Sequence, residues 1–360
     1  PKAITKKTQP PKCLAEHTGV KPPCAFVKCF HPDACNYTFT AFESCNHNDT
    51  ELKGYSNNCN DHNYKTNELT PTRCRLCATC APGYKHTGSG SECQKCPSSA
   101  DNKAWLGLGF FILIIGSTIM IYMEINSEAS KDDTADAVKK ILLNFLQIVS
   151  LAAGLPLQWP KPIEDMFNSF GTASSAGTTL LIPDCELSHL RAAEAFYLKQ
   201  WFFTFLLPMI AVACVLVWIC LHYCCHRTLN LRDRTKDYTI LSIVLLFFLC
   251  YPTIVKASFS MLRCPWVGDK MYLMADMQEE CFHGAHFQYL MMLTIPQIIL
   301  YIVGLPLVGT MHLMRNKDKL HERHFYTRYG LLYLGYRDDR AWWELVVAFR
   351  KVCVVAIGTF

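Results

Sequence analysis

Closely spaced cysteines near the start of the chain are the residues best suited to chemistry. Cys74, Cys77 and Cys80 are each separated by two residues, and Cys93 and Cys96 repeat this spacing a short way downstream. Thiols at this spacing either form disulfides or bind Zn²⁺ tetrahedrally as thiolates. Either chemistry would hold together a segment that is too poor in apolar residues to fold around a core.

The surroundings of these cysteines favour disulfides over zinc. Residues 1–100 contain eleven cysteines, few aliphatic residues and no long apolar run. Asn36 and Asn48 begin N-glycosylation sequons, which together with the cysteines indicate an oxidising compartment. We therefore predict an extracellular, disulfide-rich module over residues 1–100 that binds no metal and no other cofactor. Because eleven is an odd number, one cysteine pairs outside the module or stays free.

Apolar runs after residue 100 predict helices that cross a membrane. The hydrocarbon core of a bilayer is about 30 Å thick, which an α-helix of about 20 apolar residues spans. Residues 101–360 are therefore expected to form an α-helical polytopic membrane bundle of at least six spans, preceded by the small disulfide-rich ectodomain. The chain begins with Pro1 and stops at Phe360 inside an apolar run, which favours a piece of a longer protein. The expected spans lie near residues 105–123, 141–159, 201–223, 239–259, 290–314 and 342–360.

The loops between these spans indicate one orientation. If the cysteine-rich module lies outside, the basic loops around 224–238 and 315–341 face the cytosol, as the positive-inside rule requires. The same topology places Cys264 and Cys281 outside, on one short loop, where we expect them to pair. The predicted location is the plasma membrane or another membrane of the secretory pathway, with the N-terminal module extracellular or lumenal.

A few polar residues interrupt the expected spans. Asn144 and Gln147 are three positions apart and share a face of the second span, and Gln297 lies in the fifth. Glu344 and Lys351 are seven positions apart in the sixth span and share a face, with Arg350 beside it. Such groups avoid lipid and face protein or water. They either line an ion or ligand pathway or form hydrogen bonds between helices, and the sequence leaves both interpretations open.

Prolines occur in most of the expected spans, among them Pro208, Pro252 and Pro306. In a membrane helix a proline bends the helix and frees a carbonyl that a neighbouring helix can satisfy. The functional interpretation is a hinge, and the alternative is the ordinary composition of membrane helices, which are richer in proline than soluble ones.

Catalytic motifs and nucleic-acid-binding patterns are absent from the sequence. His321-Glu-Arg-His324 is one residue too short for a zinc-protease helix, and no phosphate-binding glycine loop occurs. The net charge of +5 comes from basic residues beside apolar segments, not from one basic face. We predict a protein that is not an enzyme and does not bind nucleic acid. Its expected partners are the lipid bilayer, an extracellular protein or matrix component, and further copies of itself or other subunits.

Two parts of the chain resemble known families. The segment around Cys77, Cys80, Cys93 and Cys96 resembles the short cysteine-rich repeat of ephrin-receptor-like and EGF-like ectodomains. The downstream part resembles the multi-pass C-terminal region of large protist and algal surface proteins, whose membrane region is similar to TRP/polycystin-like channel domains. This second resemblance is carried by residues 142–147, Gln158-Trp-Pro160, Asp184-Cys185, Tyr251-Pro252, Tyr329–Tyr336 and Trp342–Lys351.

The resemblance implies a TRP/polycystin-like cation channel or a channel-related sensory membrane protein. Its polar lining would include Asn144, Gln147, Gln297 and Glu344. A TRP-like channel also needs two further helices and a pore loop, which would have to follow Phe360. The alternative is a non-conducting receptor or adhesion anchor that binds extracellular partners through residues 1–100. A seven-helix G-protein-coupled receptor is the least favoured interpretation, because the cytosolic loops carry no recognisable coupling motif.

Overall fold

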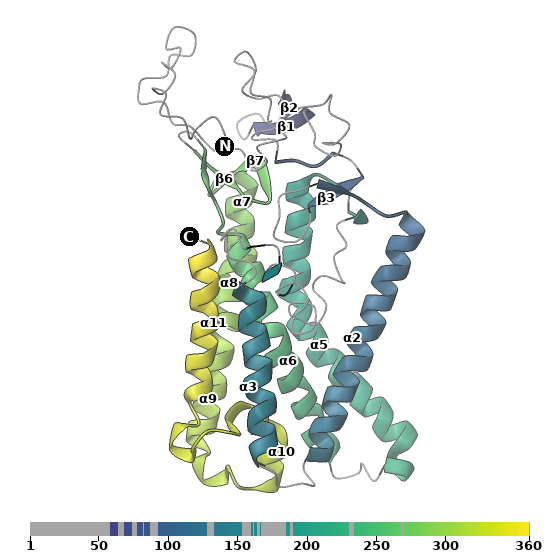
Figure 1. Cartoon of the computed structure of the whole chain (residues 1–360), viewed down its shortest axis with the longest axis vertical. Coiled ribbons are helices and arrows are strands. Elements are labelled where there is room, and N and C mark those ends of the chain that lie inside the picture. The colour runs from purple at the N-terminus through teal and green to yellow at the C-terminus, as the bar shows by residue number, and fades with distance from the viewer. Residues whose placement is uncertain are drawn as a thin grey trace. The chain divides into compact units, whose positions relative to one another are not determined.

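The described part of the chain is mainly helical in the computed structural model (Figure 1). It divides into two compact units, of which the first includes residues 264–286 and the second includes residues 194–263 and 287–360. The predicted domain boundary at residue 100 stays a prediction. The structure describes residues 58–63, 68–73, 78–81, 83–86, 93–127, 133–152, 160, 162–163, 166, 185–187, 190–229, 234–267 and 270–359.

Short antiparallel strands make up most of the described part of the first unit. A disulfide joins Cys80, which precedes β3, to Cys93, the first residue of β4. The strand pairs are β1 (Asn58–Asn63) with β2 (Glu68–Arg73), β3 (Tyr84–His86) with β4 (Cys93–Lys95), and the three-stranded sheet β5 (Trp266–Val267), β6 (Lys270–Leu273) and β7 (Asp276–Glu280).

Long helices dominate the second unit, and their apolar composition explains why they form. From Gly284 to Arg315 the helical run is continuous, and two stretches with π-helical hydrogen bonding flank Pro296. The elements are α2 (Ser99–Ser127), α3 (Asp133–Ala152), α5 (Ala192–Leu229), α6 (Thr235–Ser260), α7 (Gly284–Tyr289), η4 (Leu290–Thr294), α8 (Ile295–Gln297), η5 (Ile298–Gly304), α9 (Leu305–Arg315), η6 (Lys317–Lys319), α10 (Arg323–Tyr333), η7 (Asp338–Arg340) and α11 (Trp343–Thr359).

Contacts between side chains fix the directions of these helices. Lys140 of α3 meets Glu344 of α11, and seven residues further along both helices Gln147 meets Lys351, so α3 and α11 run parallel. Leu151, Val255 and Val355 pack in one apolar cluster, which places the C-terminal ends of α3, α6 and α11 together.

The helices α5 and η5 run in the opposite direction to α6. Gln200 near the start of α5 bonds Ala257 near the end of α6, whereas Trp218 near the end of α5 bonds Ser242. Tyr251 bonds the carbonyl of Ile302, while Gln297 meets Ser258. Successive helices therefore run in opposite directions, as expected for helices that cross a membrane one after another.

Among the described residues, three helices are long and apolar enough to cross a membrane by length and composition. They are Ala192–Tyr223, Thr235–Ser260 and Gly284–Arg315, which contain the third, fourth and fifth expected spans. The other expected spans, 105–123, 141–159 and 342–360, fall on α2, α3 and α11, which are not among these three helices. Six spans therefore remain a prediction. The helix α3 ends at Ala152, and residues 153–159 lie outside the described residues.

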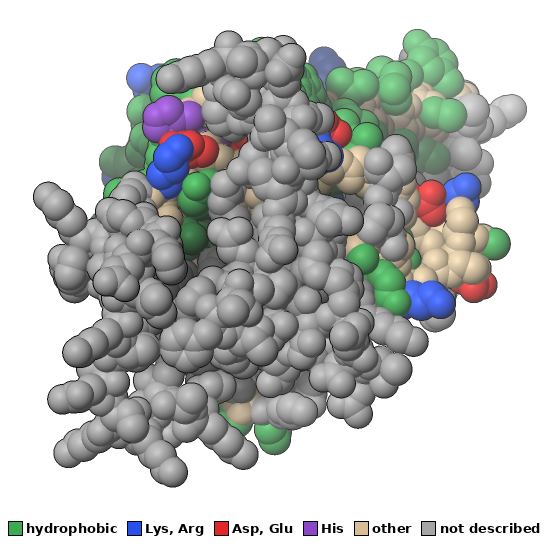
Figure 2. Space-filling model, turned by 90° about the horizontal axis from the view of Figure 1, so that it is seen from above, with side chains coloured by type: hydrophobic (Ala, Val, Ile, Leu, Met, Phe, Trp, Pro, Cys, Tyr) green, Lys and Arg blue, Asp and Glu red, His purple; other side chains and the backbone are tan. Residues whose placement is uncertain are grey.

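Large apolar side chains cover the outside of the bundle. On α5, Phe202, Met209, Val212 and Leu216 are each at least half exposed. In Figure 2, hydrophobic side chains among the described residues reach the surface. A soluble protein rarely exposes apolar area on this scale, so these faces suit contact with hydrocarbon.

Candidate functional site

A buried lysine lies in the contact between α3 and α11. The side chain of Lys351 is almost fully buried, and its ammonium group donates to Oε1 of Gln147 at 2.6 Å. The same ammonium lies 4.8 Å from the centre of the Phe248 ring, a distance suited to a cation–π contact. Buried charge is costly unless it is paired or hydrogen-bonded, and these two contacts supply that compensation.

Gln147 also serves α6 through its amide nitrogen. Its Nε2 donates to the backbone carbonyl of Phe248 at 3.2 Å. In a regular helix that carbonyl would accept from the N–H four residues later, but this position is Pro252, which has no N–H. Gln147 therefore accepts a hydrogen bond from the buried Lys351 and donates one to the carbonyl that Pro252 leaves without its usual N–H.

A second charged contact lies seven residues earlier along the contact between α3 and α11, which we call the α3–α11 seam. Nζ of Lys140 lies 3.0 Å from the Glu344 carboxylate and donates to the carbonyl of Leu332 at 2.9 Å. The hydroxyl of Tyr336 donates to the same carboxylate at 3.1 Å. Burial raises the pKa of Tyr336, and the neighbouring Glu344 charge raises it further. Lys140 thus ties α3 to α10 and to α11.

Asn144 lies between these two contacts on α3. Positions 140, 144 and 147 share one helix face, because residues three and four apart are neighbours on an α-helix. The Asn144 side chain is buried, and its Oδ1 has no hydrogen-bond partner within the described part of the chain. The seam therefore holds one unused acceptor between two lysines.

Gln297, the fourth predicted lining residue, lies elsewhere. Its side chain is almost fully buried. Its Oε1 accepts from Ser258 at 2.7 Å, and its Nε2 donates to the hydroxyl of Thr204. Gln297 thereby joins α5, α6 and α8. The structure brings Asn144, Gln147 and Glu344 to one seam and places Gln297 at a separate junction.

Pro208 repeats the relationship seen at Pro252. It leaves the carbonyl of Thr204 without an N–H from its own helix. The hydroxyl of Tyr301, from η5, donates to this carbonyl at 3.0 Å. A polar side chain of one helix therefore replaces a hydrogen bond that proline removes from another.

Pro306 provides the third case. The carbonyl of Ile302, four residues before it, accepts from the Tyr251 hydroxyl at 3.0 Å. In lipid a carbonyl without a partner is unfavourable, and neighbouring helices are known to satisfy such groups. Gln147, Tyr301 and Tyr251 thus each join two helices by a hydrogen bond to a carbonyl that a proline leaves open.

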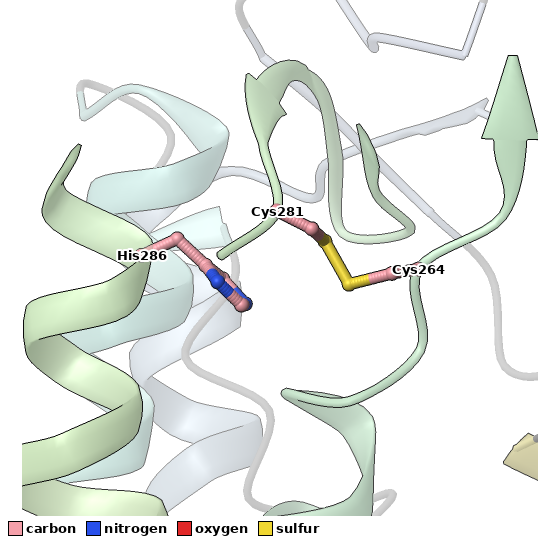
Figure 3. A group of neighbouring side chains, drawn as sticks. All are labelled: Cys264, Cys281 and His286. Carbon is pink, nitrogen blue, oxygen red and sulfur yellow. A yellow bond between two sulfur atoms is a disulfide. The ribbon is translucent and has the colours of Figure 1, made fainter. Parts of the chain in front are cut away.

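A disulfide and a buried histidine form a compact group in the first unit. Cys264 and Cys281 are bonded, and the ring of His286 points toward them from the start of α7 (Figure 3). The backbone N–H of Phe282 donates to Nδ1 of His286 at 3.0 Å. Because the two sulfurs are bonded to each other and Nδ1 already accepts a hydrogen bond, this donor set does not fit a metal ion while the disulfide is intact. The group instead fixes the loop between α6 and α7.

Other predicted site residues are only partly described. Cys96 is in a disulfide. The predicted disulfide residues Cys74 and Cys77 lie outside the described residues. The same holds for the glycosylation sequons at Asn36 and Asn48.

Sequence reasoning missed several partners in the bundle. Lys140 reads as the basic flank of a span, and Tyr251 and Tyr301 read as ordinary aromatic residues. One signal for Lys140 was present: its seven-residue distance from Gln147 matches the distance between Glu344 and Lys351. Nothing comparable marks the tyrosines, because their acceptors lie on helices remote in sequence.

Comparison with known proteins gives one distant likeness. The chain is 24% identical over 355 residues to Cysteine repeat modular protein A of Toxoplasma gondii. The match covers 79% of this chain but only 11% of that protein, so the chain spans a small part of its relative. No protein-family model and no solved structure matches the chain. The likeness to a cysteine-repeat protein and the membrane-length helices together fit a cell-surface protein.

Proposed function

We propose that the chain is the membrane-anchoring part of a cell-surface protein and that it does not conduct ions. In this proposal the helical bundle holds residues 1–100 outside the cell, where they bind an extracellular protein or matrix component. The protein has no catalytic activity of its own, and further copies or other subunits join it in the membrane.

The observation that supports an anchor most strongly is the engagement of the intramembrane polar side chains. Gln147 bonds Lys351 and a carbonyl of α6, Gln297 bonds α5 and α6, and Glu344 bonds Lys140. A side chain that lines an aqueous path keeps donors or acceptors available to the passing ion. These side chains serve contacts between helices instead.

The charges on the α3–α11 seam argue in the same direction. Within the described part of this seam, the Glu344 carboxylate pairs with Lys140 and also attracts Lys351, so that two cations share it. An excess of positive charge in an apolar interior repels a permeating cation. A cation path along this seam is therefore electrostatically unfavourable.

A TRP/polycystin-like channel or sensor is the second candidate. The unused Oδ1 of Asn144 favours it, because a buried acceptor without a partner suits a water molecule or an ion. In this case Asn144, Gln147, Gln297 and Glu344 would affect conduction. The two further helices of such a channel would have to come from the longer protein.

Two measurements separate the candidates. If the chain is an anchor, surface capture with the full chain should retain an extracellular partner. The same capture with a variant that lacks residues 1–100 should retain none. Reconstituted longer protein should pass no cation current, and Asn144→Ala and Gln297→Ala should leave partner capture unchanged. A cation current that Asn144→Ala abolishes would replace the anchor proposal with the channel.

The proposed topology has its own test. Single cysteines introduced at Trp266 and at Arg328 should react with an impermeant thiol reagent from opposite faces of the membrane. Trp266 and Arg337 are both well exposed, so cysteine at Arg337 is a second reporter for the cytosolic face. Labelling of both positions from one face would contradict the orientation.

A further inference from the structure

Two cations lie at a cavity formed by the C-terminal ends of α3, α6 and α11. Lys256 lies on the last two turns of α6, and Arg263 follows that helix by three residues. The cavity has a volume of about 80 Å³. Leu151 of α3 and Val354 of α11 line it with apolar surface. The cavity therefore combines a positively charged part with a hydrocarbon wall.

Neither cation has an acidic partner in the part of the chain that the structure describes. No carboxylate lines the cavity, and the charges of Lys256 and Arg263 repel each other. This contrasts with Lys140, which pairs with Glu344, and with Lys270, which pairs with Glu280.

The end of α6 compensates only part of this charge. A helix C-terminus carries about half an elementary negative charge, which favours nearby Lys and Arg side chains. Two full positive charges exceed that amount. The surroundings of Lys256 and Arg263 thus favour an additional anion.

We propose that this cavity binds a phosphate group. Arg263 offers a planar set of N–H donors that matches phosphate oxygens, and Lys256 adds a second positive charge. The volume suits one tetrahedral anion and is well below that of pockets for drug-sized ligands, which are about 300 Å³ or more.

The position of the cavity fits the phosphate of a lipid headgroup. Lys256 lies near the end of a membrane-length helix. In a helix that crosses a bilayer, this end would lie where headgroups meet hydrocarbon. The apolar wall would accept the first carbons of the lipid beside the phosphate. A soluble phosphate offers the same chemistry to the two cations without that apolar part.

Thermal unfolding of the full chain in neutral detergent tests this proposal. We expect phosphatidic acid, added at saturating concentration, to raise the Tm by about 5 °C, because a ligand of the folded state stabilises it. Diacylglycerol, which lacks the phosphate, should produce no shift. Inorganic phosphate at constant ionic strength shows whether the anion alone suffices.

Variants assign the shift to the two cations. Lys256→Gln and Arg263→Gln should each remove most of the shift, and Lys256→Arg should keep it. Lys236→Gln is the matched control, because Lys236 is an exposed lysine in the first turn of the same helix. If a glutamine variant fails to fold, native mass spectrometry replaces the thermal measurement. It counts the lipids bound to the wild type and to Lys256→Arg.

The outcomes divide clearly. A shift with phosphatidic acid alone assigns the site to a lipid headgroup, and a shift with inorganic phosphate as well assigns it to a phosphate anion in general. No shift with either compound, no lipid bound to the wild type, or equal shifts in the wild type and both glutamine variants would overturn the proposal.

Discussion

The ammonium group of Lys351 lies 2.6 Å from Oε1 of Gln147, although the two residues are 204 positions apart in the chain. The amide of Gln147 faces both ways, since it accepts from Lys351 and donates to the carbonyl of Phe248. One side chain thus joins α3, α6 and α11. Removing it would leave a buried cation and a buried carbonyl without these partners.

Replacement of this amide should be strongly destabilising. We expect Gln147→Leu to lower the free energy of unfolding by about 3 kcal/mol, the typical cost of leaving a buried charge without its partner. Equilibrium unfolding in detergent measures the change. Gln288→Leu, at an exposed position of α7, is the matched control and should cost little. Adding Lys351→Met to Gln147→Leu should recover part of the lost stability. Equal stability of Gln147→Leu and Gln288→Leu would contradict the role assigned to Gln147.

Each tyrosine that donates to a carbonyl left open by a proline should contribute to stability mainly while that proline is present. We expect Tyr301→Phe to cost about 1 kcal/mol, because the Thr204 carbonyl loses its donor. In a Pro208→Ala background, the alanine N–H can bond that carbonyl, so the same change should cost clearly less. A double-mutant cycle in thermal unfolding gives the coupling energy.

The control for this cycle is Tyr223→Phe, since Tyr223 is 78% exposed. It should have no effect in either background. Identical costs of Tyr301→Phe with and without Pro208 would show that the hydroxyl does not replace the missing N–H.

Loss of the Cys264–Cys281 disulfide should loosen the segment between α6 and α7. The bond closes a loop of 17 residues, for which the chain-entropy model gives a stabilisation of about 3 kcal/mol. We expect Cys264→Ser with Cys281→Ser to lower the Tm and to speed proteolysis between residues 264 and 281. Cys220→Ser, at an exposed cysteine of α5, is the control. Unchanged proteolysis in the double serine variant would argue against a role for the disulfide in fixing this loop.

Gly335 should resist substitution for two reasons. Its φ of +81° is a conformation that side chains disfavour, and an added Cβ would lie 3.1 Å from Cβ of Ala137 on α3. We expect Gly335→Ala to cost about 1–2 kcal/mol in the free energy of unfolding. Gly309→Ala is the control, because the nearest atom to its Cβ would be 3.9 Å away and the site is helical. A gain of stability in both variants would contradict the tight approach to α3.

The part of the architecture that the sequence predicts best depends on composition over long windows. Helices cover all six expected spans at least in part, because twenty apolar residues in a row leave few alternatives. Cys264 and Cys281 lie on one short loop in the sequence, and the structure joins them. Both inferences need only the local chain.

The contacts within the site could not be predicted in the same way. The shared face of Asn144 and Gln147 follows from helix periodicity, but the partner of Gln147 depends on which helices become neighbours. Periodicity also gave no means to separate Gln297 from the α3–α11 seam. Pairing across 204 residues is set by packing, which a single sequence does not reveal.

Side chains replace the backbone hydrogen bonds that three prolines prevent, and this has a mechanical consequence for the bundle. At Pro208, Pro252 and Pro306 a carbonyl that loses its N–H partner in one helix accepts a hydrogen bond from a side chain of another helix. Displacing one of these helices would therefore break a hydrogen bond with its neighbour. The helices of the second unit are consequently expected to move together.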